Sequence, residues 1–183
     1  LIFSGSSVVI ASSKEAIKRI DVCNADEMLD QVMREMPKTD LFISVAAVAD
    51  YRAKTISANK IKKRDLAKTS PRIELEETPD IIRSVASMKE KPLVIGFAAE
   101  TTSAVQNAKI KLKDKNLDAI VVNDVSRNDI GFESNENEVT FVSRTMERTI
   151  AKTDKNSLSR ELIDIIYTEF RVHLEKRHSA RLG

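Results

Sequence analysis

An acid, a phenol and a guanidinium follow directly on a short apolar run in the first third of the chain. Residues 41–45 read LFISV, and the stretch AAVADYR that follows ends in Asp50, Tyr51 and Arg52. A basic segment, KIKK at 60–63, comes soon afterwards. Side chains of these types suit an anionic substrate that carries a metal-bound phosphate.

The apolar run itself predicts a β-strand that is covered on both faces, as in a parallel sheet. In open α/β sheets, ligands bind beyond the carboxyl ends of such strands. Ala46, Ala47 and Ala49 are small enough there for a ligand to approach the backbone. The sequence therefore predicts a ligand site at the carboxyl end of this strand.

Strand and helix patterns alternate along the rest of the chain. Strands are predicted at about 1–4, 18–23, 41–45, 93–97 and 118–122, and helices at about 25–36, 79–89, 103–116 and 156–176. This order predicts an α/β, Rossmann-like, doubly wound and mostly parallel sheet flanked by helices. Segments 72–76 and 138–150 alternate like antiparallel strands and would add a short antiparallel extension. The last helix carries one apolar packing stripe, made of Leu158, Leu162, Ile165, Ile166, Phe170 and Leu174.

Composition places the chain among ordinary globular domains. Its 183 residues are 42% hydrophobic and 32% charged, with a formal net charge of +2. No apolar run is long enough to span a bilayer and no secretory leader is visible, so we expect a cytoplasmic protein without membrane contact. The single cysteine, Cys23, excludes an internal disulfide, and its alternating context predicts a buried strand thiol.

Two other function classes share part of this pattern. A nicotinamide or flavin oxidoreductase would use the same kind of sheet, but the chain has four glycines and no G-x-G-x-x-G after a strand. A nucleic-acid-binding module would explain the lysine clusters, but two tyrosines, no tryptophan and a small net charge leave little for base stacking. We therefore expect no nucleic-acid partner.

Six sequence blocks, in order, carry a resemblance to a known family. The blocks are AAVADYR at 46–52, KIKK at 60–63, TPDI at 78–81, GFAAET at 96–101, KLKDKNLD at 111–118, and NDVS followed by GF and S at 123–134. Together they resemble bacterial phosphopantothenate:cysteine ligase, also called phosphopantothenoylcysteine synthetase. This ligase is the C-terminal domain of the bifunctional coenzyme A biosynthesis protein. The resemblance runs from about Ile20 to Phe170.

The resemblance implies a ligase that condenses 4'-phosphopantothenate with L-cysteine, using CTP and passing through an acyl-cytidylate. It identifies Lys60 with the family's essential catalytic lysine, whose charge would offset the negative charge that develops on phosphate and acyl oxygens. It places the nucleotide contacts at Ser44, Val45, Ala46, Ala47, Asp50, Thr78, Pro79, Asp80, Ile81, Phe97, Lys111 and Lys115.

The same resemblance implies cofactors and partners. Mg²⁺ is expected mainly through the nucleotide phosphates, with no metal site formed by the protein alone. A homodimer is implied. FMN is expected only if a flavin decarboxylase domain is fused to the ligase in the parent protein.

Several of these positions also have a plain structural interpretation. Lys111 and Lys115 stand four residues apart on a predicted helix, where they could bracket a triphosphate or simply face solvent. Phe97 could flank the cytosine or be a core aromatic. Gly96 is expected to permit close approach to the backbone. Thr78 stands where some family members have asparagine, which bears on base preference.

One part of the family pattern is absent from these residues. The family begins with a glycine-rich strand, turn and helix that carries an asparagine near Ser-Ser-Gly, whereas this chain starts at Leu1 in what resembles the second strand. We interpret 1–183 as a single nucleotide-binding ligase domain without its first strand and helix. The alternative that stays open is a nucleotide-binding fragment or module without complete catalytic activity.

Overall fold

The computed structural model describes residues 2–4, 18–57, 59–60, 72–124 and 135–182. They belong to two compact units, which are described separately. One unit comprises Leu1–Gln31 and Ala47–Ile81, and the other comprises Val32–Ala46 and Ile82–Gly183. Lys62, Lys63 and most of the block at 123–134 lie outside the described residues.

The larger unit contains a five-stranded sheet. Its strands, in spatial order, are β3 (Leu41–Ser44), β6 (Leu93–Glu100), β7 (Ala119–Asp124), β8 (Glu136–Ser143) and β9 (Glu147–Asp154). The first three are parallel, whereas β8 and β9 are antiparallel to their neighbours. The α/β class is confirmed, but the sheet is mixed. Segment 138–150 forms most of a hairpin, β8 and β9, that extends the main sheet beside β7. Its two strands are joined by a short turn, which antiparallel pairing allows.

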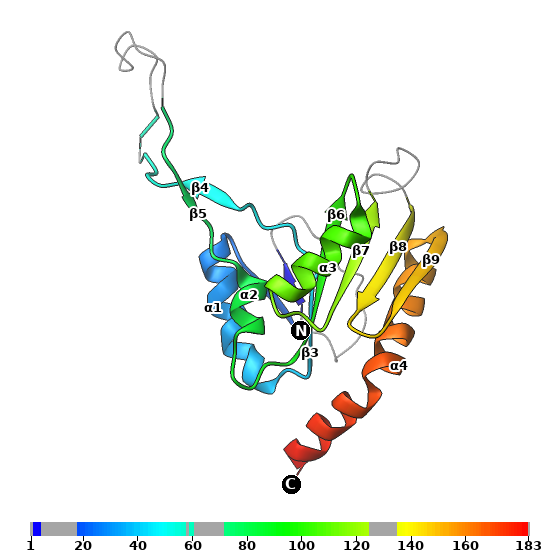
Figure 1. Ribbon diagram of the computed structural model, residues 1–183. Helices are drawn as coiled ribbons and strands as arrows, with labels where there is room; N and C mark the ends of the chain where they lie inside the picture. The colour runs from blue at the N-terminus through cyan, green and yellow to red at the C-terminus, as the bar shows by residue number, and fades with distance from the viewer. Residues whose placement is uncertain (1, 5–17, 58, 61–71, 125–134, 183) are drawn as a thin grey trace. The chain divides into compact units, whose positions relative to one another are not determined.

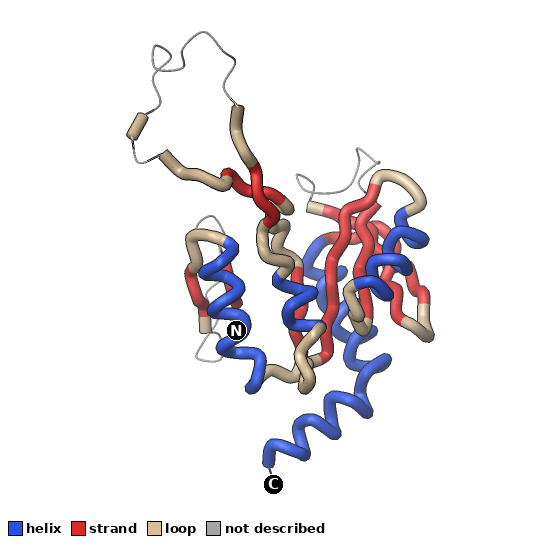
Figure 2. The backbone as a smooth tube through the Cα atoms, turned by 60° about the vertical axis from the view of Figure 1, so that its left-hand side comes forward, coloured by secondary structure: helices blue, strands red, loops and turns tan. Residues whose placement is uncertain are grey.

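Helices cover both faces of this sheet. Figures 1 and 2 show α3 (Ala104–Asp114) on one face and α4 (Lys155–Leu182) on the other. The short helix α2 (Ile81–Ala86) precedes β6, and the 3₁₀ turn Met36–Lys38 precedes β3. Within the described residues, no helix combines the length and the apolar character that crossing a membrane requires.

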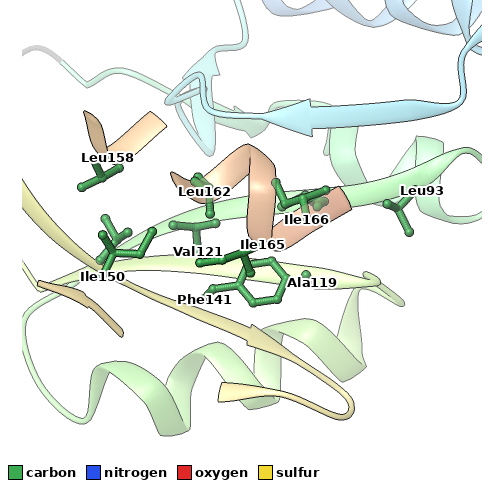
Figure 3. Close-up of a cluster of buried hydrophobic side chains, with 11 residues drawn as sticks. Leu93, Ala119, Val121, Phe141, Ile150, Leu158, Leu162, Ile165 and Ile166 are labelled. Atoms are coloured by element: carbon green, nitrogen blue, oxygen red, sulfur yellow. The ribbon is translucent and has the colours of Figure 1, made fainter. Parts of the chain in front are cut away.

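The core lies between the sheet and α4. Figure 3 shows the helix side chains resting on the alternate residues of the strands that face them. All six residues of the predicted apolar stripe pack there, which confirms that prediction. Asp154 starts the helix, because its Oδ1 accepts hydrogen bonds from the N–H groups of Asn156 and Ser157, each at 3.0 Å.

The smaller unit contains two strand pairs and the start of a helix. Strand β1 (Ile2–Ser4) is parallel to β2 (Arg19–Asp21), and β4 (Tyr51–Ala53) is antiparallel to β5 (Leu75–Glu77), as predicted for the segment around 72–76.

The helix α1 (Ala25–Glu35) begins with a cap. Asn24 Oδ1 accepts the N–H of Glu27 at 2.9 Å, and the carboxylate of Glu27 accepts the N–H of Cys23 at 2.8 Å. The prediction of a buried thiol at Cys23 is wrong. Strand β2 ends at Asp21, so Cys23 lies exposed in the turn before the helix cap.

Candidate active site

The carboxyl end of β6 lies three residues beyond the predicted strand end. Ala98, Ala99 and Glu100 continue the parallel pairing with β7, where Glu100 lies beside Asp124. Phe97 is therefore inside the strand, half-buried against the core on the α4 side. These contacts are those of a core aromatic, and a role for Phe97 beside cytosine stays a prediction.

A lysine and a half-buried carboxylate meet at this end of β6. Glu100 Oε1 accepts a hydrogen bond from Lys111 Nζ at 2.5 Å, and Glu100 Oε2 accepts one from Asn107 Nδ2 at 3.2 Å. The Glu100 side chain is 12% exposed and that of Lys111 is 48% exposed. The hydrogen bond from Lys111 lowers the pKa of Glu100 against the opposing effect of burial. Glu100 is therefore ionised at neutral pH.

The turn after β6 explains how these side chains meet. Ser103 adopts a left-handed backbone conformation with φ of 47°, and α3 starts at the next residue. Helical side chains point back toward the helix amino end, so Lys111 reaches toward the end of the strand from about two turns into the helix. Asn107 Nδ2 also donates to the carbonyl of Thr102 at 3.0 Å, which ties the helix to the turn.

Lys115 stands one turn further along, at the end of α3. Its N–H donates to the Lys111 carbonyl at 3.0 Å, as expected for residues four apart on a helix. The helix ends two residues before the predicted boundary because Asn116 turns left-handed, with φ of 53°. The N–H groups of Asn116 and Leu117 then close the end on the carbonyls of Lys113 and Leu112. Contacts at the β6 end are therefore formed by Lys111, whereas Lys115 is half-buried at the other end of the helix.

The end of β3 supplies the small-residue stretch. Ser44 pairs with Gly96, and Val45, 62% exposed, and Ala46 follow it. Gly96 permits close approach to the backbone, as expected, and the groups that approach it are side chains of the fold. A Cβ there would lie 3.0 Å from Ile82 Cδ1 and 3.1 Å from a Leu117 methyl group, so glycine permits close packing of α2 and the loop before β7.

A buried amide lies at the end of β7. Asn123 stands between Ala99 of β6 and Val139 of β8. Its Oδ1 is buried and has no hydrogen-bond partner among the described residues. Together with Glu100 and Lys111, this amide forms a polar group of side chains at the carboxyl ends of β6 and β7.

Other candidate residues lie in the smaller unit. The carbonyl of Asp50 accepts the N–H of Thr78 at 2.8 Å, so the structure brings these two predicted positions together. The Thr78 hydroxyl is buried without a hydrogen-bond partner within the described part of the chain. Pro79 and Asp80 are half-buried before α2, and Ile81 is buried, whereas Ala47 and the Asp50 side chain are exposed.

The basic residues near the first motif differ in their surroundings. Arg52 donates Nε to Glu76 Oε1 at 2.7 Å and Nη1 to Asp26 Oδ2, and these hydrogen bonds raise the pKa of the guanidinium. Arg52 is thus engaged with two carboxylates that link β4 to β5 and α1. Lys60 is exposed, and no ion pair includes it among the described residues.

Sequence reasoning did not single out two members of this site, Glu100 and Asn107. The signal was present, because an acid ends a buried strand and a lysine follows it on the next helix. In the described ranges, no cluster of three or more histidine, cysteine, aspartate or glutamate side chains could hold a metal ion.

Family comparison decides what this fold is. Residues 2–170 match the family described as the DNA/pantothenate metabolism flavoprotein C-terminal domain. The chain belongs to this family. That membership explains why the six blocks occur in one order along the chain.

Two curated relatives from different bacteria carry the same name. The coenzyme A biosynthesis bifunctional protein CoaBC of Vibrio vulnificus (strain YJ016) is 41% identical over 153 residues, which are 83% of this chain and 38% of that protein. The protein of the same name from Escherichia coli (strain K12) is 38% identical over 155 residues, which are 84% of this chain and 38% of that protein. The chain thus spans about two fifths of the length of these curated relatives.

Solved structures of the family agree with the fold. A crystal structure of the C-terminal domain of CoaBC has a TM-score of 0.71 and 30% identity, and the match covers 92% of this chain and 73% of that one. The DNA/pantothenate metabolism flavoprotein from Streptococcus pneumoniae has a TM-score of 0.71 at 18% identity, covering 91% of this chain and 77% of that one, and supports the fold alone.

Proposed function

We propose that this chain forms the ligase part of a protein that joins 4'-phosphopantothenate to L-cysteine with CTP, in coenzyme A biosynthesis. The observation that carries the proposal is the family match over residues 2–170. The names of the relatives, which place CoaBC in coenzyme A biosynthesis, support it. The lysine and half-buried acid at the end of β6 suit a phosphate-bearing substrate, because ligands of α/β sheets bind beyond the carboxyl ends of parallel strands.

The proposed reaction has two steps. A carboxylate oxygen of 4'-phosphopantothenate attacks the α-phosphorus of CTP, forming a P–O bond while the bond to the β-phosphate breaks and pyrophosphate leaves. The cysteine amine then attacks the acyl carbon of the cytidylate, forms the amide C–N bond, loses a proton and releases CMP. Neither step needs a covalent enzyme intermediate, so positioning and charge can supply the catalysis.

Specific residues take roles in this proposal. Lys111 presents an ammonium to the nucleotide phosphates from the end of β6, with Lys115 one turn away. Lys60, exposed and without an ion pair among described groups, stabilises the charge that develops as the carboxylate attacks. Ala46 and Ala47 offer accessible backbone, and Asp50 offers an exposed carboxylate to a ribose hydroxyl or a hydrated magnesium ion.

Cofactors and assembly follow the same proposal. Mg²⁺ enters with CTP and is held mainly by phosphate oxygens. FMN would belong to a decarboxylase domain fused to the ligase in the parent protein. The relatives are named bifunctional, which fits such a fusion. A homodimer is part of the proposal, and sedimentation of the full-length protein would test it.

Nucleotide binding gives the first test. We expect the full-length protein to bind CTP at least about tenfold more tightly than ATP, each titrated with magnesium in a calorimeter, which corresponds to about 1.4 kcal/mol. Equal affinity for both nucleotides would contradict the base preference. NADH is the control titration, and tight NADH binding would favour an oxidoreductase instead.

The first half-reaction gives the second test. When 4'-phosphopantothenate and CTP are supplied without cysteine, the full-length protein should release pyrophosphate, and omission of 4'-phosphopantothenate should abolish the release. Binding of CTP with no pyrophosphate under any condition would support the alternative, a nucleotide-binding module without complete catalytic activity.

A further inference from the structure

We propose that Glu100 is a positioning residue for the nucleotide: it holds the Lys111 ammonium at the carboxyl end of β6, oriented to receive phosphate oxygens. This inference rests on the proposed function, in which Lys111 contacts the phosphates. It adds a residue that touches no substrate and acts through the lysine.

The geometry separates a buried side of the pair from an open side. The Glu100 side chain is 12% exposed, whereas the Lys111 side chain is 48% exposed, so the lysine is the more accessible partner of the pair. A lysine ammonium has three N–H donors, and the 2.5 Å contact with Glu100 uses one of them. Two donors therefore remain for phosphate oxygens that approach from solvent.

Preorganisation gives the pair its effect. A lysine side chain has four flexible carbons and loses much rotamer freedom when it binds an anion. Contact with a fixed carboxylate removes part of that freedom before the nucleotide arrives, which favours binding. The carboxylate is itself fixed, because Asn107 Nδ2 holds its second oxygen at 3.2 Å and also donates to the Thr102 carbonyl at 3.0 Å.

The partners of Glu100 argue against a purely structural role. Among the described residues its carboxylate accepts only from two side chains of α3, Lys111 and Asn107, and from no backbone N–H. Asp118, at the opposite end of the same strands, accepts the N–H of buried Val94 at 2.8 Å besides the ammonium of Lys91 at 3.0 Å. The Asp118 pair stabilises the sheet backbone, whereas the Glu100 pair fixes a side chain that faces solvent.

Steady-state kinetics of the full-length protein test the inference. Glu100→Gln keeps the size of the side chain and removes its charge. We expect it to raise the KM for CTP about tenfold, with kcat within about threefold and the KM for 4'-phosphopantothenate unchanged. Lys111→Met should raise the KM for CTP at least as much, and the double variant should be no worse than Lys111→Met alone, because Glu100 acts through the lysine.

Asp118→Asn is the matched control, since it removes a partly buried carboxylate charge next to a lysine at the opposite end of the same two strands. It should lower the melting temperature and leave the KM for CTP unchanged. If Glu100→Gln does not fold, Asn107→Ala serves in its place, with an expected rise of about threefold in the KM for CTP.

Each outcome decides one question. If Lys111→Met raises the KM for CTP and Glu100→Gln does not, the positioning role is overturned and the proposed function stands. If Glu100→Gln weakens CTP equally in the Lys111→Met background, Glu100 acts independently of the lysine and the inference is wrong. If Lys111→Met itself leaves the KM for CTP unchanged, the nucleotide role of Lys111 fails, and the inference fails with it.

Discussion

The two ends of strands β6 and β7 each hold a lysine beside a carboxylate, yet the two pairs serve different neighbours. At the amino end, Asp118 binds both the backbone N–H of Val94 and Lys91, and Lys91 also donates to the Asn116 carbonyl at 2.8 Å. At the carboxyl end, Glu100 binds side chains alone. A carboxylate that accepts from a buried backbone N–H contributes to the fold, whereas one that accepts only from the side chains of Lys111 and Asn107 leaves the exposed lysine accessible to a ligand.

Further contacts sharpen the contrast between these ends. Arg177 of α4 donates Nη1 to the Lys91 carbonyl at 2.8 Å and Nη2 to the Thr39 carbonyl at 3.4 Å, which ties the helix to the loops before β6 and β3. At the carboxyl end, the Oδ1 of Asn123 stays buried without a partner in the described structure. Arg177 Nε at the amino end is also buried without a hydrogen bond among the described residues, but it lies 3.7 Å from the carboxylate of Asp40. The amino end is thus held by charged contacts of the fold, whereas the carboxyl end keeps a buried amide oxygen without a partner among the described residues.

The largest expected effect is on turnover, and it distinguishes Lys60, the proposed catalytic lysine, from Lys91, a lysine whose contacts stabilise the fold. Lys60→Gln in the full-length protein should lower turnover about 10²-fold or more, with little change in CTP affinity, since one charge that stabilises the transition state is lost. Lys91→Gln should leave turnover within about threefold, because its contacts lie in the fold. Turnover and calorimetric CTP affinity measured side by side check both. Unchanged turnover in Lys60→Gln would mean that this lysine only faces solvent.

The next largest effect concerns stability at the amino end. Asp118→Ala leaves the buried N–H of Val94 without its acceptor and should lower the free energy of unfolding by about 2–3 kcal/mol. Glu100→Ala should cost less than about 1 kcal/mol, because the half-exposed Lys111 can be hydrated instead. Urea unfolding of both variants measures the difference. Equal losses would erase the distinction between the two ends.

Gly96→Ala probes the middle of β6, between the two ends. The added methyl would meet Ile82 and Leu117 side-chain atoms at 3.0 and 3.1 Å, so we expect a loss of about 1 kcal/mol from overpacking. Because these contacts are with the fold, CTP affinity should not change. A loss of CTP affinity without a loss of stability would indicate that Gly96 lies in the ligand site instead.

The smallest expected effect is a pH dependence at the carboxyl end. Lys111 lowers the pKa of Glu100 below its ordinary value of 4.5, so the pair's contribution to stability is present above pH 4.5 and is lost as the pH falls through the lower, folded-state pKa. The difference in unfolding free energy between wild type and Glu100→Gln should therefore shrink below pH 4.5. We expect a change under about 1 kcal/mol, measurable by urea unfolding between pH 3 and 6. A difference that grows with acid would contradict the sign of the shift.

Periodicity was enough to predict most elements of the fold. The apolar stripe of α4 was identified residue by residue, because a helix that packs on a sheet repeats its buried positions every three to four residues. The mixed sheet was harder to predict. Alternation in 138–150 indicates antiparallel strands, but which sheet they join depends on contacts with β7, a neighbour that local pattern does not reveal.

The site shows the same limit. Motif resemblance identified Lys111, but its partner Glu100 is set by how far β6 continues and by the left-handed turn at Ser103, and neither has a strong local signal. Cys23 was misjudged for a related reason, since a capped helix start interrupts the alternation on which the buried thiol was inferred. The elements that carry single residues such as Lys111 could be predicted, whereas the contact between Lys111 and Glu100 could not.

The placement of α4 has a consequence for how the chain folds during synthesis. Ribosomes add about 5–20 residues each second, so the 28 residues of α4 take roughly 1.5 to 6 seconds after the last strand has been made. Until then, the side chains of α4 cannot cover the face of the sheet that carries Ile95, Val121 and Phe141. A chaperone could bind this apolar face during synthesis, and α4 would displace it by packing on the sheet.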